Sequence, residues 1–249
     1  MQKKQRTRSQ KPSGRYFVID ALRGAALVAM FAYHFSFDLV YFRVVQANPY
    51  ESAIWITCRA LILTSFLLLV GISLVLANRD GMRWTPFWKR FGQLAGCALL
   101  VSIGSYLIFP KSWIYFGVLH HIAVASLLGL VFLRFNLLNL LLGVMLIIVG
   151  AFVRWPLFDA PPLHWVGLMT RKPITEDYVP LLPWFGVVMI GLFLGKRLLR
   201  ESLTGIKPWR PNNTPLRLLA LAGRHTLLLY MVHQPIFLGL LYLVLGKQQ

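Results

Sequence analysis

The chain has 249 residues, of which 57% are hydrophobic and 14% charged, and its mean hydropathy is +0.62. This composition is too apolar for a water-soluble domain and places the chain among polytopic membrane proteins. A formal net charge of +18 would suggest nucleic acid as the partner of a soluble protein, but here the basic residues cluster between apolar spans, so we expect no nucleic-acid binding.

Residues 1–14 form a basic segment ahead of the first apolar span. Positive charge without a small-residue cleavage site indicates a retained cytosolic tail rather than a cleaved signal peptide. Residues 15–249 then form a single transmembrane domain. Its apolar spans, each near the length that a membrane-crossing helix needs, cover residues 16–41, 54–77, 91–109, 115–133, 137–154, 181–199 and 217–245. The predicted fold is therefore an all-α membrane bundle of about seven helices.

The basic residues are unevenly distributed between the two sides of this bundle. Most of them lie in the N-terminal tail, in residues 79–90 and in residues 196–224. These three segments fall on one side, and the positive-inside rule assigns that side to the cytosol. We therefore predict a cytosolic N-terminus and a C-terminus on the far side.

The first span, residues 16–41, carries a stripe of four polar side chains: Asp20, Arg23, His34 and Asp38. At about 100° per residue the two carboxylates share one azimuth, and the other two lie beside it. Arg23 and His34 are separated by roughly 16 Å along the axis. Ionisable groups inside a bilayer must face a partner or a wet cavity, which makes them functional candidates. As an i, i+4 pair, His34 and Asp38 are expected to hydrogen-bond, whereas Asp20 with Arg23 is equally explained as a structural ion pair.

Two further histidines, His120 and His121, begin the fourth span at its outer half. One of them can reach the same cavity as His34, while the other points about 100° away. The alternative is that both only cap the helix or bond between helices. Imidazole suits zinc, but the usual closed ligand set is missing, so we predict no metal site.

The last span opens with Arg224 and His225 at its cytosolic end. Tyr230 and His233 are three residues apart and share a helix face further in. Before this span, residues 155–184 form a long proline-rich stretch that contains Asp177. Long segments of this kind are usually functional or disordered, and the many aromatic residues favour a lid or acceptor-binding loop at the outer face.

Five ordered segments of the chain resemble the heparan-α-glucosaminide N-acetyltransferase-like family, in its small bacterial form, within the transmembrane acyltransferase superfamily. They are DALRG (20–24), GISL (71–74), FGVLHHIAVASLLGL (116–130), DYVPLLPWFGVVMIGLFLGK (177–196) and GRHTLLLYMVHQP (223–235). The resemblance implies acetyl-CoA as a cytosolic donor, a histidine inside the membrane, and an amino or hydroxyl sugar on the far side as acceptor. We expect the protein in the cytoplasmic (inner) membrane, where an envelope glycan is a further candidate acceptor. Lysosomal members carry the histidine held to be catalytic after the first helix, and residues 39–59 contain none. The role of His34 therefore follows the wider superfamily motif.

These observations give a set of assigned roles. The predicted catalytic residues are His34, Asp38, His120 and His233. Those predicted to bind acetyl-CoA are Arg23, Arg224 and His225, and those predicted to bind the acceptor are Asp177, His121 and Tyr230. The imidazole of His34 acts either as the base or as the first acetyl acceptor. A transporter and a non-catalytic scaffold are the alternatives, although no internal repeat favours transport; formation of a homo-oligomer stays open.

Overall fold

The computed structural model describes residues 16–203 and 213–246, and within these ranges the chain is helical, with no strand. Its α-helices are α1 (Phe17–Tyr41), α2 (Ala53–Ala77), α3 (Trp84–Ile108), α4 (Val118–Phe132), α5 (Leu137–Phe152), α6 (Leu181–Leu203), α7 (Thr214–Arg224) and α8 (Thr226–Leu245). Two short 3-10 helices, η1 (Pro156–Asp159) and η2 (Pro161–Val166), lie between α5 and α6. The basic tail expected at residues 1–14 lies outside the described residues.

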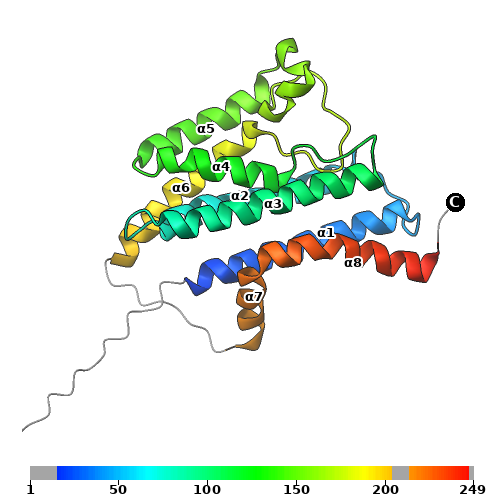
Figure 1. The fold of residues 1–249 in the computed structure, drawn as a ribbon, viewed down its shortest axis with the longest axis horizontal. Coiled ribbons are helices and arrows are strands. Elements are labelled where there is room, and N and C mark those ends of the chain that lie inside the picture. Colours follow the sequence, from blue (N-terminus) through cyan, green and yellow to red (C-terminus); the bar gives the residue numbers. More distant parts are fainter. Residues whose placement is uncertain (1–15, 204–212, 247–249) are drawn as a thin grey trace, which may run out of the picture.

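The helices form a bundle in which all except α7 run lengthwise through the molecule (Figure 1). Five of the described helices, α1, α2, α3, α6 and α8, are long and apolar enough to cross a membrane. The other two lengthwise helices are apolar but shorter, with 15 residues in α4 and 16 in α5. The predicted all-α polytopic fold is confirmed. Below, the inner end of the bundle is the end where α1 begins, and the outer end is where α1 finishes.

The short helix α4 leaves room for loops at the outer end. Fifteen residues span about 22 Å, which is less than the roughly 30 Å of hydrocarbon in a bilayer. The segment that follows η2 fills this space, because the backbone N–H of Val179 donates to the Phe116 carbonyl oxygen at 3.1 Å. Ser112 Oγ also donates to Glu176 Oε1 at 2.5 Å. Residues 167–180 thus fold back onto the bundle, as the aromatic content of the longer stretch 155–184 predicts.

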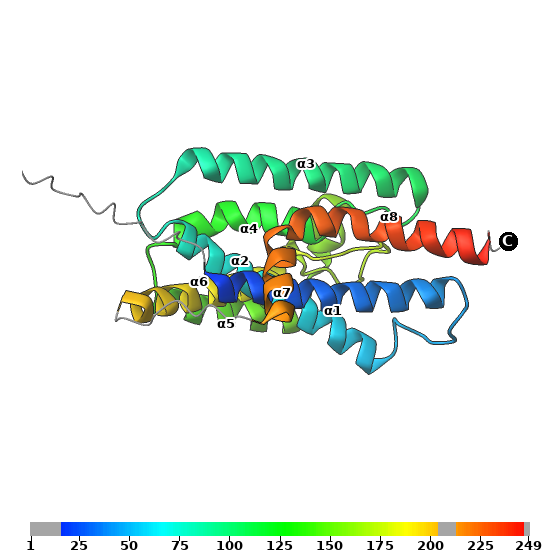
Figure 2. The same cartoon turned by 90° about the horizontal axis from the view of Figure 1, so that it is seen from below.

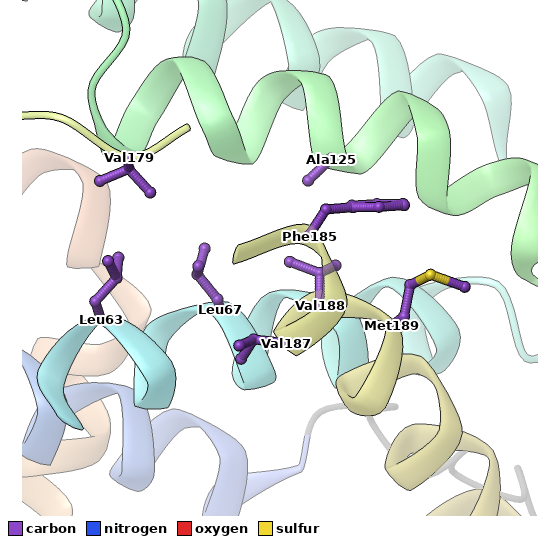
Figure 3. Packing of buried hydrophobic residues seen from close by; sticks show 8 residues of the cluster. All are labelled: Leu63, Leu67, Ala125, Val179, Phe185, Val187, Val188 and Met189. Carbon is purple, nitrogen blue, oxygen red and sulfur yellow. The ribbon is translucent and has the colours of Figure 1, made fainter. Parts of the chain in front are cut away.

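The apolar core lies between α2, α4 and α6, and Figure 3 shows its buried side chains around the space between these helices. Its buried members are Leu63, Leu67, Ala125, Val179, Phe185, Val187, Val188 and Met189. Gly71 permits the close contact of α2 with α6, because a Cβ at this position would lie 2.2 Å from the Val188 carbonyl oxygen. Small residues have this role in membrane bundles, where backbones must approach closely for dispersion to hold helices together.

The last predicted span, residues 217–245, is wrong as a single helix. The chain breaks at His225, whose φ of −107° and ψ of 22° end α7 and precede α8. The helix α7 then crosses α1 instead of extending α8 (Figures 1 and 2). Gly223 makes this crossing possible, since a Cβ there would lie 1.7 Å from the Asp20 carbonyl oxygen. The crossing brings Arg224 to the beginning of α1.

Candidate active site

Two imidazole rings meet where α1 packs beside α8. The ring centroids of His34 and His233 are 5.1 Å apart, with an interplanar angle of 61°. Phe31 stacks on the His233 ring at 5.3 Å, and Phe237 meets that ring edge-on at 5.9 Å. The two helices run in the same direction along the bundle and are in contact (Figure 1). Two histidines that are far apart in the sequence, both predicted to be catalytic, therefore lie together.

Asp38 is almost fully buried, with 2% of its surface exposed, and it turns towards α8. Gln234 Nε2 donates to its Oδ1 at 2.8 Å. The hydrogen bond expected between His34 and Asp38 is not formed, because the carboxylate pairs across the helix interface instead of along α1. Asp38 Oδ2 and Gln234 Oε1 are buried acceptors with no hydrogen-bond partner in the described chain. Such atoms are uncommon in folded proteins and mark a place where a bound group can supply donors.

The hydrogen bonding of His233 fixes which of its nitrogens can accept a proton. Its Nδ1 lies 2.5 Å from the backbone carbonyl oxygen of Tyr230, which can only accept, so Nδ1 carries the hydrogen. The lone pair of the neutral ring is then on Nε2. This nitrogen is buried and has no partner in the described chain. We call His34, Asp38, His233 and Gln234 the histidine layer.

Arg59 of α2 is a further charged side chain near the histidine layer. It is not among the site residues predicted from the sequence. Its Nη2 donates to the backbone carbonyl oxygen of Tyr178 at 3.2 Å. The guanidinium is within electrostatic reach of His34 and Asp177. A single arginine in an apolar span has to face a partner or a cavity. This rule, applied to the second span as it was to the first, would have identified Arg59.

Asp177, predicted to bind the acceptor, is attached to the first turn of α4. Its Oδ2 accepts from the backbone N–H of Val118 at 2.7 Å, so the carboxylate caps the helix. Burial raises the pKa of Asp177, against the opposing effects of the Val118 hydrogen bond and the charges of Arg59 and Lys172. Asp177 is also within electrostatic reach of Tyr230, whose ring centroid lies 5.5 Å from that of His233. Asp177 is therefore a helix-capping carboxylate whose field reaches Tyr230, the neighbour of His233.

The outer loops above this region are held by their own hydrogen bonds. The Asp159 carboxylate accepts from the backbone N–H and from the hydroxyl of Thr170, at 2.7 Å and 2.6 Å. The Tyr178 hydroxyl donates to the His164 carbonyl oxygen at 2.6 Å. Burial raises the pKa of Tyr178, so this phenol remains a donor at neutral pH. The loops thus form an ordered cover instead of a floppy linker.

The two neighbouring histidines of α4 have different surroundings. Both ring nitrogens of His120 are engaged, since Nδ1 accepts from the Gly117 N–H at 3.2 Å and Nε2 lies 3.1 Å from Ser102 Oγ. His120 therefore caps α4 and joins it to α3, which is the structural alternative that the sequence left open. His121 is fully buried, with its ring near the backbone carbonyls of Val179 and Pro180. Neither ring stacks on His34 or His233 in the described chain.

A second polar layer lies at the inner end of the bundle. Asp20 is 2% exposed and pairs with two arginines, Arg23 Nη1 at 3.0 Å and Arg224 Nε at 3.4 Å. Arg23 also donates to the Ser73 hydroxyl on α2. We call Asp20, Arg23, Ser73 and Arg224 the ion-pair layer. His225, next in the chain, is exposed beside it.

A metal centre has no support within residues 16–203 and 213–246, where no three histidine, cysteine or acidic side chains come together. A site made of histidines, a carboxylate and arginines inside apolar helices is typical of a multi-pass membrane protein with intramembrane chemistry.

The comparison with known families identifies the class of protein. The family model described as heparan-alpha-glucosaminide N-acetyltransferase, catalytic, matches residues 15–235. The chain therefore belongs to this family of membrane acetyltransferases, and the resemblance seen in the sequence is confirmed. No curated protein and no solved structure matches the chain.

Proposed function

We propose that the protein transfers an acetyl group from acetyl-CoA, bound at the inner end of the bundle, to an amine or hydroxyl of a sugar or envelope glycan that enters from the outer end. The membrane is then the cytoplasmic (inner) membrane. The observation that carries this proposal is the histidine layer, where buried acceptor atoms of Asp38, His233 and Gln234 have no hydrogen-bond donor among the described residues. Family membership favours this reaction over a transporter or a scaffold.

The inner end supplies groups for a polyanionic donor. Arginine binds phosphate with parallel, charge-assisted hydrogen bonds. Of the two arginines in the ion-pair layer, Arg224 has the more accessible side chain, 43% exposed compared with 19% for Arg23. Together with the exposed His225, it forms the expected docking point for the phosphates of coenzyme A. Arg23, held by Asp20 and Ser73, then positions this docking point on α1.

The histidine layer supplies a base. In the direct route an imidazole takes the proton of the acceptor N–H or O–H while the acceptor attacks the acetyl carbon. The imidazolium then returns this proton to the departing thiolate, so that the products are the acetylated acceptor and free coenzyme A. Asp38 and Gln234 offer two further acceptor atoms that orient the attacking group. In the relay route an imidazole nitrogen attacks the thioester first, so that the C–S bond breaks and coenzyme A leaves. The acceptor then attacks the acetyl-imidazole, loses its proton and regenerates the free ring.

Arg59 is suited to stabilising the charge that develops during transfer. Attack on a thioester carbonyl places negative charge on its oxygen, and fixed donors aimed at this oxygen lower the barrier. The guanidinium uses one N–H for the Tyr178 carbonyl oxygen and is within electrostatic reach of His34. It is thus a permanent cation whose field reaches the proposed base.

The test is acetyl transfer by the purified protein in liposomes. Labelled acetyl-CoA is supplied at the inner end, amine- and hydroxyl-bearing sugars at the outer end, and the acetylated sugar is measured. His34→Ala should lower turnover by about 10² to 10⁴. The matched control is Ser36→Ala, since Ser36 is exposed on the same helix and only bonds the Ala32 carbonyl oxygen. Acid-quenched protein that carries label on a histidine indicates the relay route. Turnover by His34→Ala at the native rate would refute the assignment.

A further inference from the structure

A pocket opens at the inner end of the bundle, on the α4 and α6 side of α2. Its lining residues are Val75, Asn78, Arg79, Met82, Leu133, Lys196 and Leu199, and its volume is about 240 Å³. The wall is formed by the ends of α2, α4 and α6 and by the loop that joins α2 to α3. None of these residues belongs to the ion-pair layer or the histidine layer. The pocket is therefore a separate feature of the structure.

The charges in this pocket are positive and only partly compensated. Arg79 bonds Asp80 Oδ2 and the Tyr16 hydroxyl, both at 3.2 Å, so its charge is shared. Lys196 on α6 is half-buried, and its ammonium has no hydrogen bond or ion pair within the described chain. A lysine at this depth extends its apolar stem along neighbouring side chains and holds its charge at the membrane boundary. Its position suits a ligand that brings a negative charge.

The remaining walls indicate what carries that charge. About half of the lining is apolar, namely Val75, Leu133 and Leu199. A strongly hydrated free anion would lose water beside these side chains without gaining hydrogen bonds, which is unfavourable. The helices that form the walls also expose apolar side chains, Val131 on α4 and Leu198 on α6. A ligand with a phosphate group on an apolar body can contact the basic side chain with its phosphate and the apolar walls with its body. Basic pockets between membrane helices on the cytoplasmic side bind anionic lipid headgroups in this way.

We propose that this pocket binds the phosphate-bearing headgroup of an anionic membrane lipid, with Lys196 as the phosphate partner and Val75, Leu133 and Leu199 against its apolar part. The phosphates of coenzyme A share this chemistry, so the test has to separate the two sources. The lipid site does not depend on acetyl transfer, and its failure would leave the proposed enzymatic function unaffected.

The experiment measures lipid binding by native mass spectrometry of the detergent-purified full chain. The probes are phosphatidylglycerol, which is anionic, and phosphatidylcholine, which has no net charge. One phosphatidylglycerol should bind at least tenfold more tightly than phosphatidylcholine. Lys196→Gln should remove this preference. Met82→Trp, which puts a larger side chain among the lining residues and keeps the charge, should remove it too. The control Arg200→Gln, one turn further along α6 and exposed, should retain it.

Three results would overturn the proposal. The first is equal binding of phosphatidylglycerol by the native protein and by both pocket variants. The second is an equal loss in Arg200→Gln, because this would indicate general attraction to a basic surface. The third is displacement of the lipid by coenzyme A together with loss of coenzyme A binding in Lys196→Gln, since the pocket would then belong to the acetyl donor. Thermal unfolding of each variant in phosphatidylcholine nanodiscs shows that the fold is intact.

Discussion

The helix α1 carries two carboxylates that are equally buried but differ in their hydrogen-bond and ion-pair partners. Asp20, in the ion-pair layer, is 2% exposed and pairs with two guanidinium groups. Asp38, in the histidine layer, is also 2% exposed, yet within residues 16–203 and 213–246 it receives one amide hydrogen bond and its other oxygen has no partner. A buried charge whose partners are complete holds helices together, whereas incomplete pairing next to two imidazoles leaves room for chemistry. Burial alone therefore does not distinguish the two roles.

We expect substitution of His233 to have the strongest consequence for acetyl transfer. His233→Gln keeps a side-chain amide that can donate to the Tyr230 carbonyl oxygen, but it removes the proton-accepting nitrogen. Acetyl transfer should fall by about 10² to 10⁴, with little change in the unfolding temperature. The turnover assay in liposomes measures the first quantity and thermal unfolding the second.

His120→Gln is the matched variant, because both nitrogens of His120 already have partners. It should lower the unfolding temperature and leave turnover within a few-fold of the native value. A larger loss of turnover in His120→Gln than in His233→Gln would show that hydrogen-bond saturation does not separate structural from catalytic histidines here.

The next effect concerns stability and separates the two carboxylates directly. Asp20→Ala leaves two arginines without their shared partner and should lower the free energy of unfolding by about 3 kcal/mol. Asp38→Asn should leave it unchanged, because the new amide N–H can donate to Gln234 Oε1. Unfolding in mixed detergent micelles measures both. Equal destabilisation by the two substitutions would contradict the distinction between the layers.

The ion-pair layer can also be disturbed without a change in its charges, by a larger residue at the helix crossing. Gly223→Leu forces α7 away from α1, since a Cβ at this position has no room beside the Asp20 carbonyl oxygen. We expect a loss of about 2 kcal/mol in stability, typical of overpacking, and weaker binding of acetyl-CoA. Gly239→Leu on α8 is the control, because nothing lies within 4 Å of a Cβ there. An unaltered Gly223→Leu protein would mean that the crossing of α7 is not tight.

We expect the smallest effect at the surface, where the stability of the outer loop should depend on pH through Asp159. Hydrogen bonds from Thr170 lower the pKa of Asp159 below its ordinary value. The charged form is thus favoured in the folded loop, so its stabilising contribution is present above about pH 4. It is lost as the pH falls through the lowered pKa. Limited proteolysis of the loop at successively lower pH should show this loss in the native chain and its absence in Asp159→Asn.

The sequence predicted the helices well because length and apolar content determine which segments cross a membrane. The stripe on α1 also followed from the helical period, and Asp20 and Asp38 are both buried as that stripe implies. What the sequence could not supply was the identity of cross-helix partners. The amide of Gln234 competes with the His34 imidazole for Asp38, and this competition depends on the register of α8 against α1.

The break between α7 and α8 was missed for a related reason. Residues 217–245 are apolar enough to be one span, and His225 is an ordinary helical residue by composition. The break depends on the tight contact of Gly223 with the Asp20 backbone, which is a property of two helices and not of one. Arg59 is different, because the sequence alone shows that it is the one charged residue of the span 54–77. The rule that such a charge faces a partner or a cavity therefore applies to it without knowledge of the fold.

Since α1 is one uninterrupted helix, it acts as a ruler between the two faces of the membrane. The eleven-residue step from Arg23 to His34 fixes a separation of roughly 16 Å along its axis. Under the proposed function, an acyl carrier that anchors its charged end beside Arg23 has to extend a flexible arm over a distance of this order to present its thioester to the imidazoles. Carriers with much shorter arms would then be rejected by reach alone, without any contact to the acyl group itself.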